Sequence, residues 1–321
     1  MNRRAFLTTL SLGLTMPARD AKAQRSGGFR IGFLWPGPHP PEYHEGVVEA
    51  LHGFGYREGQ NLVVDYRFGA PDELRSQAVE LVHLNVDVIH AGSSAGTRAA
   101  IGATRKIPIV AVDLETDPVA NGFASTLAHP GGNLTGFFLN FPEFSAKRLE
   151  ILKEALPSVS RVAVLWDSSM ERAPLSGLEA AAQRLKLHLS VIELRDDTEL
   201  PRAFDRATKM KAGVVMVMPS PRLDGYKLKI LELAAAQRAP VMTLFAHFTA
   251  DGGLLSYGPN IRDLLGRSAT YVAKVLEGNK PGDLPIQRPA KFDFVVNLKT
   301  AKTLGITIPE SILLRADEVI R

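Results

Sequence analysis

The chain of 321 residues contains no cysteine, which excludes disulfide bonds, thiolate metal sites and a cysteine nucleophile. Its 38 basic and 34 acidic residues give a net charge of +4, but most of this excess lies in the first 23 residues. The remaining 34 basic and 33 acidic residues nearly balance, so charge predicts no general attraction to nucleic acid or to an anionic membrane. About 300 residues after that segment are enough to bury the core of two lobes.

The first 23 residues have the pattern of an export signal. Arg3 and Arg4 form a basic start, an apolar stretch runs to Met16, and Ala21 to Ala23 read Ala-Lys-Ala, an A-x-A cleavage site. The apolar stretch is too short to span a bilayer, and no later run approaches that length. The paired arginines favour a twin-arginine signal over an ordinary secretory one. Both routes predict cleavage near Ala23 and a periplasmic location.

Apolar runs typical of strands then alternate with amphipathic helical stretches. We expect strands at residues 29–35, 61–68, 87–91 and 108–113, and helices at 42–54, 72–84 and 95–105. This alternation predicts βαβ units with right-handed crossovers, and therefore a parallel sheet. Residues 116–137, rich in Gly, Pro and Asn, are expected to be irregular.

The same rhythm starts again after this segment. We expect strands at 161–167, 189–194, 213–218, 241–245 and 292–297, and helices at 143–156, 175–185, 200–209, 223–237, 261–277 and 298–304. Two successive units of similar size predict an α/β protein with two doubly wound parallel-sheet lobes, joined near residues 137–142.

In open parallel sheets, ligands bind outside the carboxyl ends of the strands. With two lobes, those ends can face each other across a cleft, so the loops that follow the strands are the places to look for a site. The candidate ligand-binding residues in these loops are Trp35, Ser93, Ser94, Thr97, Asp113, Asp117, Asp167, Ser220, Phe245 and Asp251.

The loop at residues 92–97 reads Gly-Ser-Ser-Ala-Gly-Thr and opens a predicted helix. Its glycines allow close backbone approach, and helix N–H groups with three hydroxyls favour an anionic oxygen. We therefore expect Ser93, Ser94 and Thr97 to hold a carboxylate or phosphate, although these serines could simply cap the helix.

Three acidic residues, Asp113, Glu115 and Asp117, follow another predicted strand. They could form a turn or accept hydrogen bonds from a ligand ammonium, and we favour both over acid–base catalysis. Trp35 and Phe245 fall at strand ends, where aromatic rings either cover the core or stack on a flat ligand.

A serine hydrolase is the competing interpretation, because residues 92–96 satisfy G-x-S-x-G with Ser94 at the nucleophile position. A triad would need His247 and an acid such as Asp224, but spacing singles out neither. Only two predicted strands precede the one that leads to the serine, and the glycine-rich run at 129–132 follows the serine. Both features count against a nucleophile elbow.

Four potential metal ligands, His39, Glu42, His44 and Glu45, lie within seven residues of one another. Their spacing matches no recognised ligand set, and prolines interrupt the segment. We expect a solvated loop here and predict neither a metal nor a cofactor.

Several segments resemble the ABC-transporter substrate-binding family that includes tryptophan- and tyrosine-binding members. The resemblance runs from about Phe29 to the C-terminus. It is carried by Asp-Pro-Val at 117–119, Pro-Gly-Gly-Asn-Leu-Thr-Gly at 130–136, Gly-Gly-Leu-Leu-Ser-Tyr-Gly-Pro-Asn at 252–260, Asn-Leu-Lys-Thr-Ala-Lys-Thr-Leu-Gly at 297–305, Ile-Pro at 308–309 and Arg-Ala-Asp-Glu-Val-Ile at 315–320.

The resemblance implies a type I periplasmic-binding-protein fold whose two lobes are joined by three crossovers. On that pattern the first lobe comprises residues 29–139 and 259–284, and the second comprises 140–258 and 285–321. The crossovers near 138–141, 257–260 and 283–287 would be the hinges of lobe closure.

The resemblance also implies a receptor that is not an enzyme. It would carry a small solute, an amino acid or another carboxylate, to a permease in the inner membrane that a cytoplasmic ATPase drives. A sensory module feeding a membrane kinase would share the same fold. Two departures from the family pattern indicate a specialised cleft. Residues 248–251 read Phe-Thr-Ala-Asp where relatives carry a Glu, and Trp35 stands where smaller residues are commoner. The resemblance therefore does not by itself assign an aromatic amino acid as the ligand.

Overall fold

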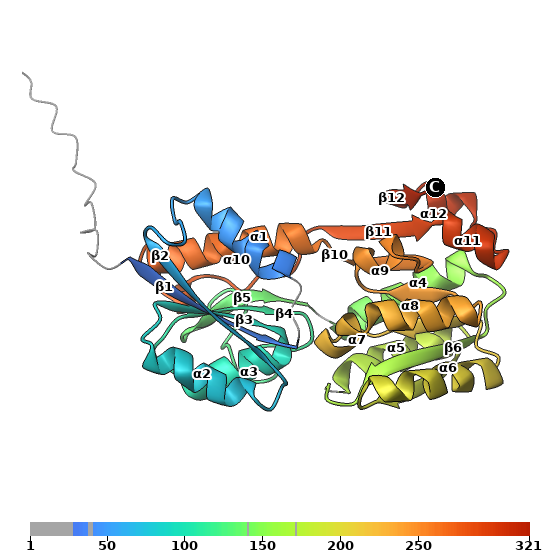
Figure 1. Ribbon diagram of the computed structural model, residues 1–321, viewed down its shortest axis with the longest axis horizontal. Helices are drawn as coiled ribbons and strands as arrows, with labels where there is room; N and C mark the ends of the chain where they lie inside the picture. Colours follow the sequence, from blue (N-terminus) through green and yellow to red (C-terminus); the bar gives the residue numbers. More distant parts are fainter. Residues whose placement is uncertain (1–27, 38–40, 140, 171) are drawn as a thin grey trace, which may run out of the picture.

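The structure is a computed structural model that describes residues 28–37, 41–139, 141–170 and 172–321. Two α/β lobes lie side by side, each built around its own sheet (Figure 1). One sheet has five strands and the other has seven. The predicted fold class of two doubly wound α/β lobes is confirmed.

The first lobe contains a parallel sheet in the order β2-β1-β3-β4-β5. Successive side chains of a strand point to opposite faces of the sheet. Because apolar side chains lie on both faces of this sheet, helices cover both of them. Ile31 and Phe33 pack in the same cluster as α1 and α10, whereas Leu34 packs with α2 and α3. The elements are β1 (Phe29–Pro36), α1 (Pro41–His52), β2 (Leu62–Gly69), α2 (Leu74–His83), β3 (Val88–Gly92), α3 (Ser93–Ala103), β4 (Ile109–Asp113), β5 (Leu134–Phe138), α10 (Ile261–Leu276) and the short 3-10 helix η2 (Pro281–Asp283).

The second lobe contains a sheet in the order β12-β11-β10-β9-β8-β6-β7. Its described strand pairs are parallel except β10 with β11. Helices α4 and α5 pack on one face, and α6 and α8 pack on the other. The elements are α4 (Phe141–Ala155), β6 (Arg161–Asp167), α5 (Ala173–Arg184), β7 (His188–Leu194), the 3-10 helix η1 (Asp197–Glu199), α6 (Leu200–Lys209), β8 (Val214–Val217), α7 (Pro221–Gly225), α8 (Lys227–Ala236), β9 (Val241–Thr243), α9 (Ala246–Ala250), β10 (Leu255–Pro259), β11 (Phe292–Asn297), α11 (Leu298–Leu304), α12 (Glu310–Leu313) and β12 (Glu318–Ile320).

The chain passes between the lobes three times: from β5 to α4, from β10 to α10, and from η2 to β11. The third passage lies later than the sequence predicts. Gln287 pairs with Phe137, and the Leu284 carbonyl accepts a hydrogen bond from the Thr135 hydroxyl, so residues 284–287 still run along β5 of the first lobe. The chain crosses at 288–291, where the Lys291 carbonyl accepts the Asn260 N–H at 2.9 Å and links the second and third passages.

The sequence analysis misses several elements in segments rich in glycine and proline. β5 lies in a stretch predicted to be irregular, and β10 lies in one predicted to be a hinge. The predicted helix at 223–237 is divided between α7 and α8 around Tyr226. α9, α12 and β12 are each five residues or fewer, too short for hydrophobic periodicity to reveal.

Gly136 in β5 generates the first testable prediction. Its φ is +136°, and a Cβ added there would lie 2.0 Å from the backbone oxygen of Ala111 on β4. Because a backbone atom cannot move aside without breaking the β4–β5 ladder, Gly136→Ala should cost more than about 2 kcal/mol of unfolding free energy.

Chemical denaturation measures this loss. Gly266→Ala is the matched control, because Gly266 lies inside α10 and a Cβ there meets nothing within 4 Å. The control should gain up to about 1 kcal/mol from helix propensity. Equal stabilities for the two variants would contradict the packing argument.

Candidate ligand-binding site

Two adjoining cavities lie where the carboxyl ends of the two sheets face each other. The inner cavity measures about 80 Å³ and the outer one about 430 Å³, and both are lined by Pro36, Ser93 and Pro221. The inner cavity is mainly apolar; its lining comprises Trp35, Pro36, Val112, Leu114, Pro219, Pro221, Phe245, Ile261, Leu264 and Leu265, together with the polar residues Ser93, Glu115, Ser220 and Asp224. Residues from both lobes therefore form one site.

Trp35 forms an aromatic wall of the inner cavity at the end of β1. Its indole packs directly on Gly92, where a Cβ would lie 2.0 Å from the ring, so only glycine leaves room for it. The indole stacks on His90, with ring centroids 5.8 Å apart, and its Nε1–H donates to His90 Nδ1 at 3.3 Å. Gly92 and His90 therefore fix the position of the Trp35 indole.

A hydrogen-bond chain links this wall to helix α10. The Ser268 hydroxyl donates to the Leu265 carbonyl at 2.8 Å and can therefore accept from His90 Nε2, 3.0 Å away. His90 is fully buried, and burial lowers its pKa to about 3, so the ring stays neutral. A neutral ring with its proton on Nε2 leaves Nδ1 free to accept from Trp35.

The start of α3 holds the serines and threonine that the sequence assigns to an anion. Ser93 has a left-handed φ of +57°, which is uncommon outside glycine, and it lines both cavities. Thr97 donates its hydroxyl to the Ser93 carbonyl at 2.7 Å. Ser94 donates both its N–H and its hydroxyl to Glu115 Oε2, at 3.1 and 2.6 Å. Ser93 therefore lines the cavities, while the hydroxyls of Ser94 and Thr97 are already engaged by the protein.

The three acidic residues after β4 have different surroundings. Asp113 is fully buried, and its Oδ1 accepts the N–H groups of Glu115 and Thr116, both at 3.0 Å. Glu115 lines the inner cavity. Burial raises the pKa of both carboxyls, and at Glu115 the charge of Asp113 adds to the effect. Asp117 is exposed and accepts the N–H groups of Val119 and Ala120, so it shapes its own turn.

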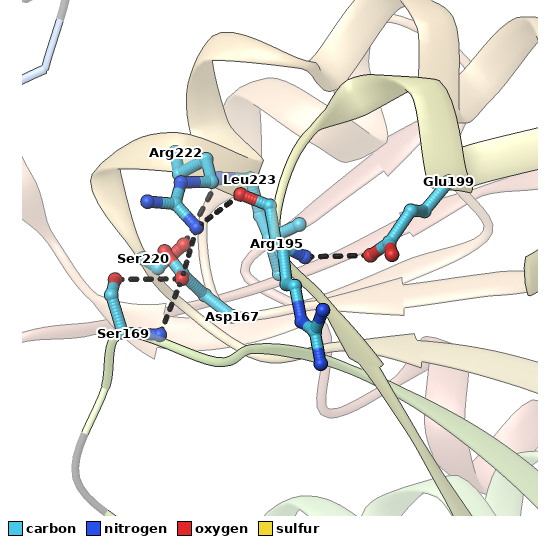
Figure 2. A network of polar contacts seen from close by, with 7 residues as sticks. All are labelled: Asp167, Ser169, Arg195, Glu199, Ser220, Arg222 and Leu223. Carbon is cyan, nitrogen blue, oxygen red and sulfur yellow. Dashed lines mark hydrogen bonds and ion pairs between the residues drawn. The ribbon is translucent and has the colours of Figure 1, made fainter.

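The second lobe contains a polar network (Figure 2), of which Asp167, Ser169 and Arg222 line the outer cavity. Asp167 is buried, and its Oδ1 accepts the N–H and hydroxyl of Ser169 together with Arg222 Nη1 at 3.0 Å. Arg222 Nη1 also donates to the Arg195 carbonyl at 2.6 Å. Asp167 therefore orients a guanidinium that lines the cavity. Ser220 lines the inner cavity and caps α7 by accepting the Leu223 N–H.

Phe245 and Asp251 flank α9 but are placed differently. Phe245 lines the inner cavity and stacks on His247, whose Nε2 lies 2.6 Å from Asp224 Oδ1. Asp251 is exposed and pairs with Lys227 at 2.6 Å, and neither cavity includes it in its lining. His247 and Asp224 thus form a pair, while the Ser94 hydroxyl is bonded to Glu115.

Two further findings concern the described part of the chain. No group of three or more His, Asp or Glu residues there could hold a metal ion. No helix there is both long and apolar enough to cross a membrane. His39 and residues 1–23, to which the metal and export hypotheses refer, lie outside the described residues.

Comparison with known proteins identifies the family. Residues 36–320 match the family described as ABC transporter substrate binding protein. The chain belongs to this family. It is 26% identical over 294 residues to a tyrosine-binding protein of Clostridioides difficile strain R20291, covering 89% of this chain and 83% of that one. The resemblance stated from the sequence motifs is confirmed.

Two solved structures share the fold. A conserved domain protein from Vibrio cholerae O1 biovar El Tor strain N16961 is 27% identical, with a TM-score of 0.83 over 91% of this chain and 99% of that one. An ABC domain from Streptococcus pneumonia, solved in complex with L-Trp, is 24% identical, with a TM-score of 0.83 over 92% of this chain and all of that one. The periplasmic-binding-protein fold is confirmed.

This ABC transporter substrate-binding protein is not an enzyme. The hydrolase interpretation is therefore wrong, in agreement with a Ser94 hydroxyl that donates to a carboxylate instead of to a histidine. The candidate ligand-binding residues chosen from the sequence did not include Glu115, Asp224 and Arg222, which line the cavities, although the sequence drew attention to Glu115 in its acidic loop and to Asp224 as a possible triad acid. It also missed Ile261, Leu264 and Leu265, because they reach the site from a helix that returns across a crossover.

Gly92 provides a test of the aromatic wall. Gly92→Ala would place a Cβ within about 2 Å of the Trp35 indole and should push the ring out of its position. In a Trp166→Phe background, where Trp35 is the remaining tryptophan, we expect a red-shifted emission and stronger quenching by acrylamide. Gly102→Ala is the control, because its Cβ meets nothing within 4 Å. An unchanged spectrum in the Gly92 variant would rule out this packing.

Proposed function

We propose that this protein captures an amino acid with an apolar, aromatic side chain between its lobes and delivers it to an ABC permease of the inner membrane. The observation that carries the proposal is the inner cavity, whose mainly apolar lining includes the carboxyl groups of Glu115 and Asp224 and which adjoins an outer cavity lined by the Arg222 guanidinium. An amino acid combines these features: an apolar body, an ammonium and a carboxylate. The export signal expected at residues 1–23 supports a periplasmic location.

The apolar walls suit a flat side chain. Trp35 comes from the first lobe and Phe245 from the second, and Leu264 and Leu265 of α10 complete the lining. Aromatic rings pack well against such walls in stacked or edge-on arrangements. The outer cavity, about 430 Å³, lies within the usual size range of small-molecule sites.

The polar groups suit the two charges of an amino acid. Glu115 and Asp224 line the inner cavity and can accept hydrogen bonds from an ammonium. Arg222 lines the outer cavity, and its pairing with Asp167 leaves a planar fork of donors that suits a carboxylate. Ser93 lines both cavities and would therefore lie beside the α-carbon of such a ligand, to which the ammonium and the carboxylate are both attached.

The relatives support this ligand class. One is named a tyrosine-binding protein, and another was solved with L-Trp bound. Because both lobes contribute walls, a ligand in the cavity would favour the arrangement in which the lobes are close together. Such a closed form is what a transporter could distinguish from the empty receptor.

A thermal-shift screen of the chain from Gln24 onward tests the proposal. L-tryptophan, L-tyrosine and L-phenylalanine should stabilise the protein, by about 2.7 kcal/mol at a concentration one hundred times Kd. Succinate and glucose serve as non-aromatic comparisons. If succinate or glucose stabilised the protein and none of the three aromatic amino acids did, the protein would not be an aromatic amino-acid receptor.

Arg222→Gln should weaken binding of L-tryptophan at least tenfold, because the carboxylate loses a charged donor. Arg195→Gln is the matched control, since Arg195 enters the network through its backbone N–H and carbonyl (Figure 2). Calorimetry measures both variants. An unchanged affinity in the Arg222 variant would remove this residue from the carboxylate site.

A further inference from the structure

We infer that Asp113 and Glu115 together hold one proton in the empty protein, and that a ligand amine entering the inner cavity displaces this proton into solvent. The inference rests on the proposed function, because it concerns the ammonium end of the same ligand. It makes Glu115 the group that selects protonated amines. It also makes binding to the receptor dependent on pH.

The geometry around Glu115 leaves one carboxyl oxygen available. Ser94 directs both of its donors to Oε2, and no described residue donates a hydrogen bond to Oε1. Glu115 lines the inner cavity, so Oε1 can meet a ligand there. Ser94 therefore acts as a positioning residue that holds the carboxyl group at the cavity wall.

Asp113 lies two residues before Glu115, and its buried carboxyl group is only partly compensated, because the two N–H groups it accepts both point to Oδ1. It is fully buried, and its Oδ2 is a buried atom with no hydrogen-bond partner in the described part of the chain. Burying a carboxylate that has one unpartnered oxygen is unfavourable, and the charge of Asp113 also disfavours ionisation of Glu115. One proton bound to either carboxyl group removes one of the two charges.

The charged groups around the pair do not supply a cation at the cavity. Arg98 acts on Asp113 and partly offsets its burial. Asp167 acts unfavourably on Glu115 from the second lobe, where it is paired with Arg222. Asp224 also lines the cavity and is paired with His247. No Lys, Arg or His is present among the described lining residues of the inner cavity.

The surroundings therefore favour the protonated pair until a cation arrives. Burial is the main cause of the raised pKa at both residues, and the neighbouring carboxylates add to it at Glu115. An amine at the cavity wall supplies the missing positive charge. The O–H bond of the carboxyl breaks, the proton passes to buffer, and the ligand keeps its own proton as an ammonium.

The sign of the pH effect follows from this exchange. While the empty pair is protonated, binding requires loss of one proton, so affinity for an amine should rise towards tenfold per pH unit. It should level off once the empty pair ionises by itself. A ligand that has a carboxylate but no amine should show no such rise.

The first experiment needs no ligand. A carboxyl whose pKa is higher in the folded than in the unfolded protein binds more protons when folded, so its contribution to stability falls as pH rises. Glu115→Gln removes this loss of stability. The melting temperature of the variant minus that of the wild type should therefore increase as the pH is raised from 5 to 8. Asp117→Asn is the control, because Asp117 is exposed and only caps its own turn. A difference between Glu115→Gln and wild type that does not change with pH would overturn the stored proton.

The second experiment measures proton release by calorimetry in phosphate and in Tris, which differ in ionisation enthalpy. L-tryptophan and tryptamine should each release close to one proton at pH 7, and Glu115→Gln should release none and bind at least tenfold more weakly. Indole-3-propionate, which has no amine, should release none from wild type. Binding of L-tryptophan without proton release would overturn the inference and leave the proposed function standing. If no indole compound binds, the proposed function and the release step both fail, and the ligand-free titration still decides whether the pair stores a proton.

Discussion

Parallel strands place all their carboxyl ends at one edge of a sheet, and the candidate site depends on this constraint. Each lobe of this protein has one such edge, and the three passages of the chain hold the two edges against each other. Trp35, Glu115 and Ser220 are far apart in the sequence, yet they line one cavity because each lies at or just after the carboxyl end of a strand. The site therefore arises from topology before any individual side chain is considered.

Each lobe carries a buried ionisable side chain at the end of one of its strands. In the first lobe Asp113 is fully buried at the end of β4, and the half-buried Glu115 follows it. In the second lobe Arg148 of α4 is fully buried; its Nη2 donates to the Val217 carbonyl at 3.3 Å, and its Nη1 contacts Met218 Sδ at 3.8 Å. Burial lowers the pKa of Arg148 to about 9, which still leaves it charged at neutral pH. Arg148 therefore holds the end of β8 in place from inside the second lobe.

Hydrophobic periodicity predicted the long elements well, because their core positions repeat with the period of a helix or a strand. α6 was predicted with its observed bounds, whereas β5 and β10 were missed because glycine and proline obscure a buried strand. The loops of the site could be predicted from the order of strands, but the side-chain roles could not. Thr97 and Asp117 satisfy nearby backbone groups, and Asp251 pairs with Lys227, interactions that depend on local rotamers.

Contact with the aromatic wall would also connect the ligand to lobe closure. Trp35 is joined through His90 and Ser268 to α10, and α10 begins directly after the second passage between the lobes. A ligand can shift closure only by as much as it binds the closed form better than the open one. Because Phe245 and Asp224 belong to the second lobe, contacts with them add to those with Trp35 only when the lobes are together. In the proposed function, a preference for closure would come from these second-lobe contacts, whereas Trp35 and Glu115 would contact the ligand in either form.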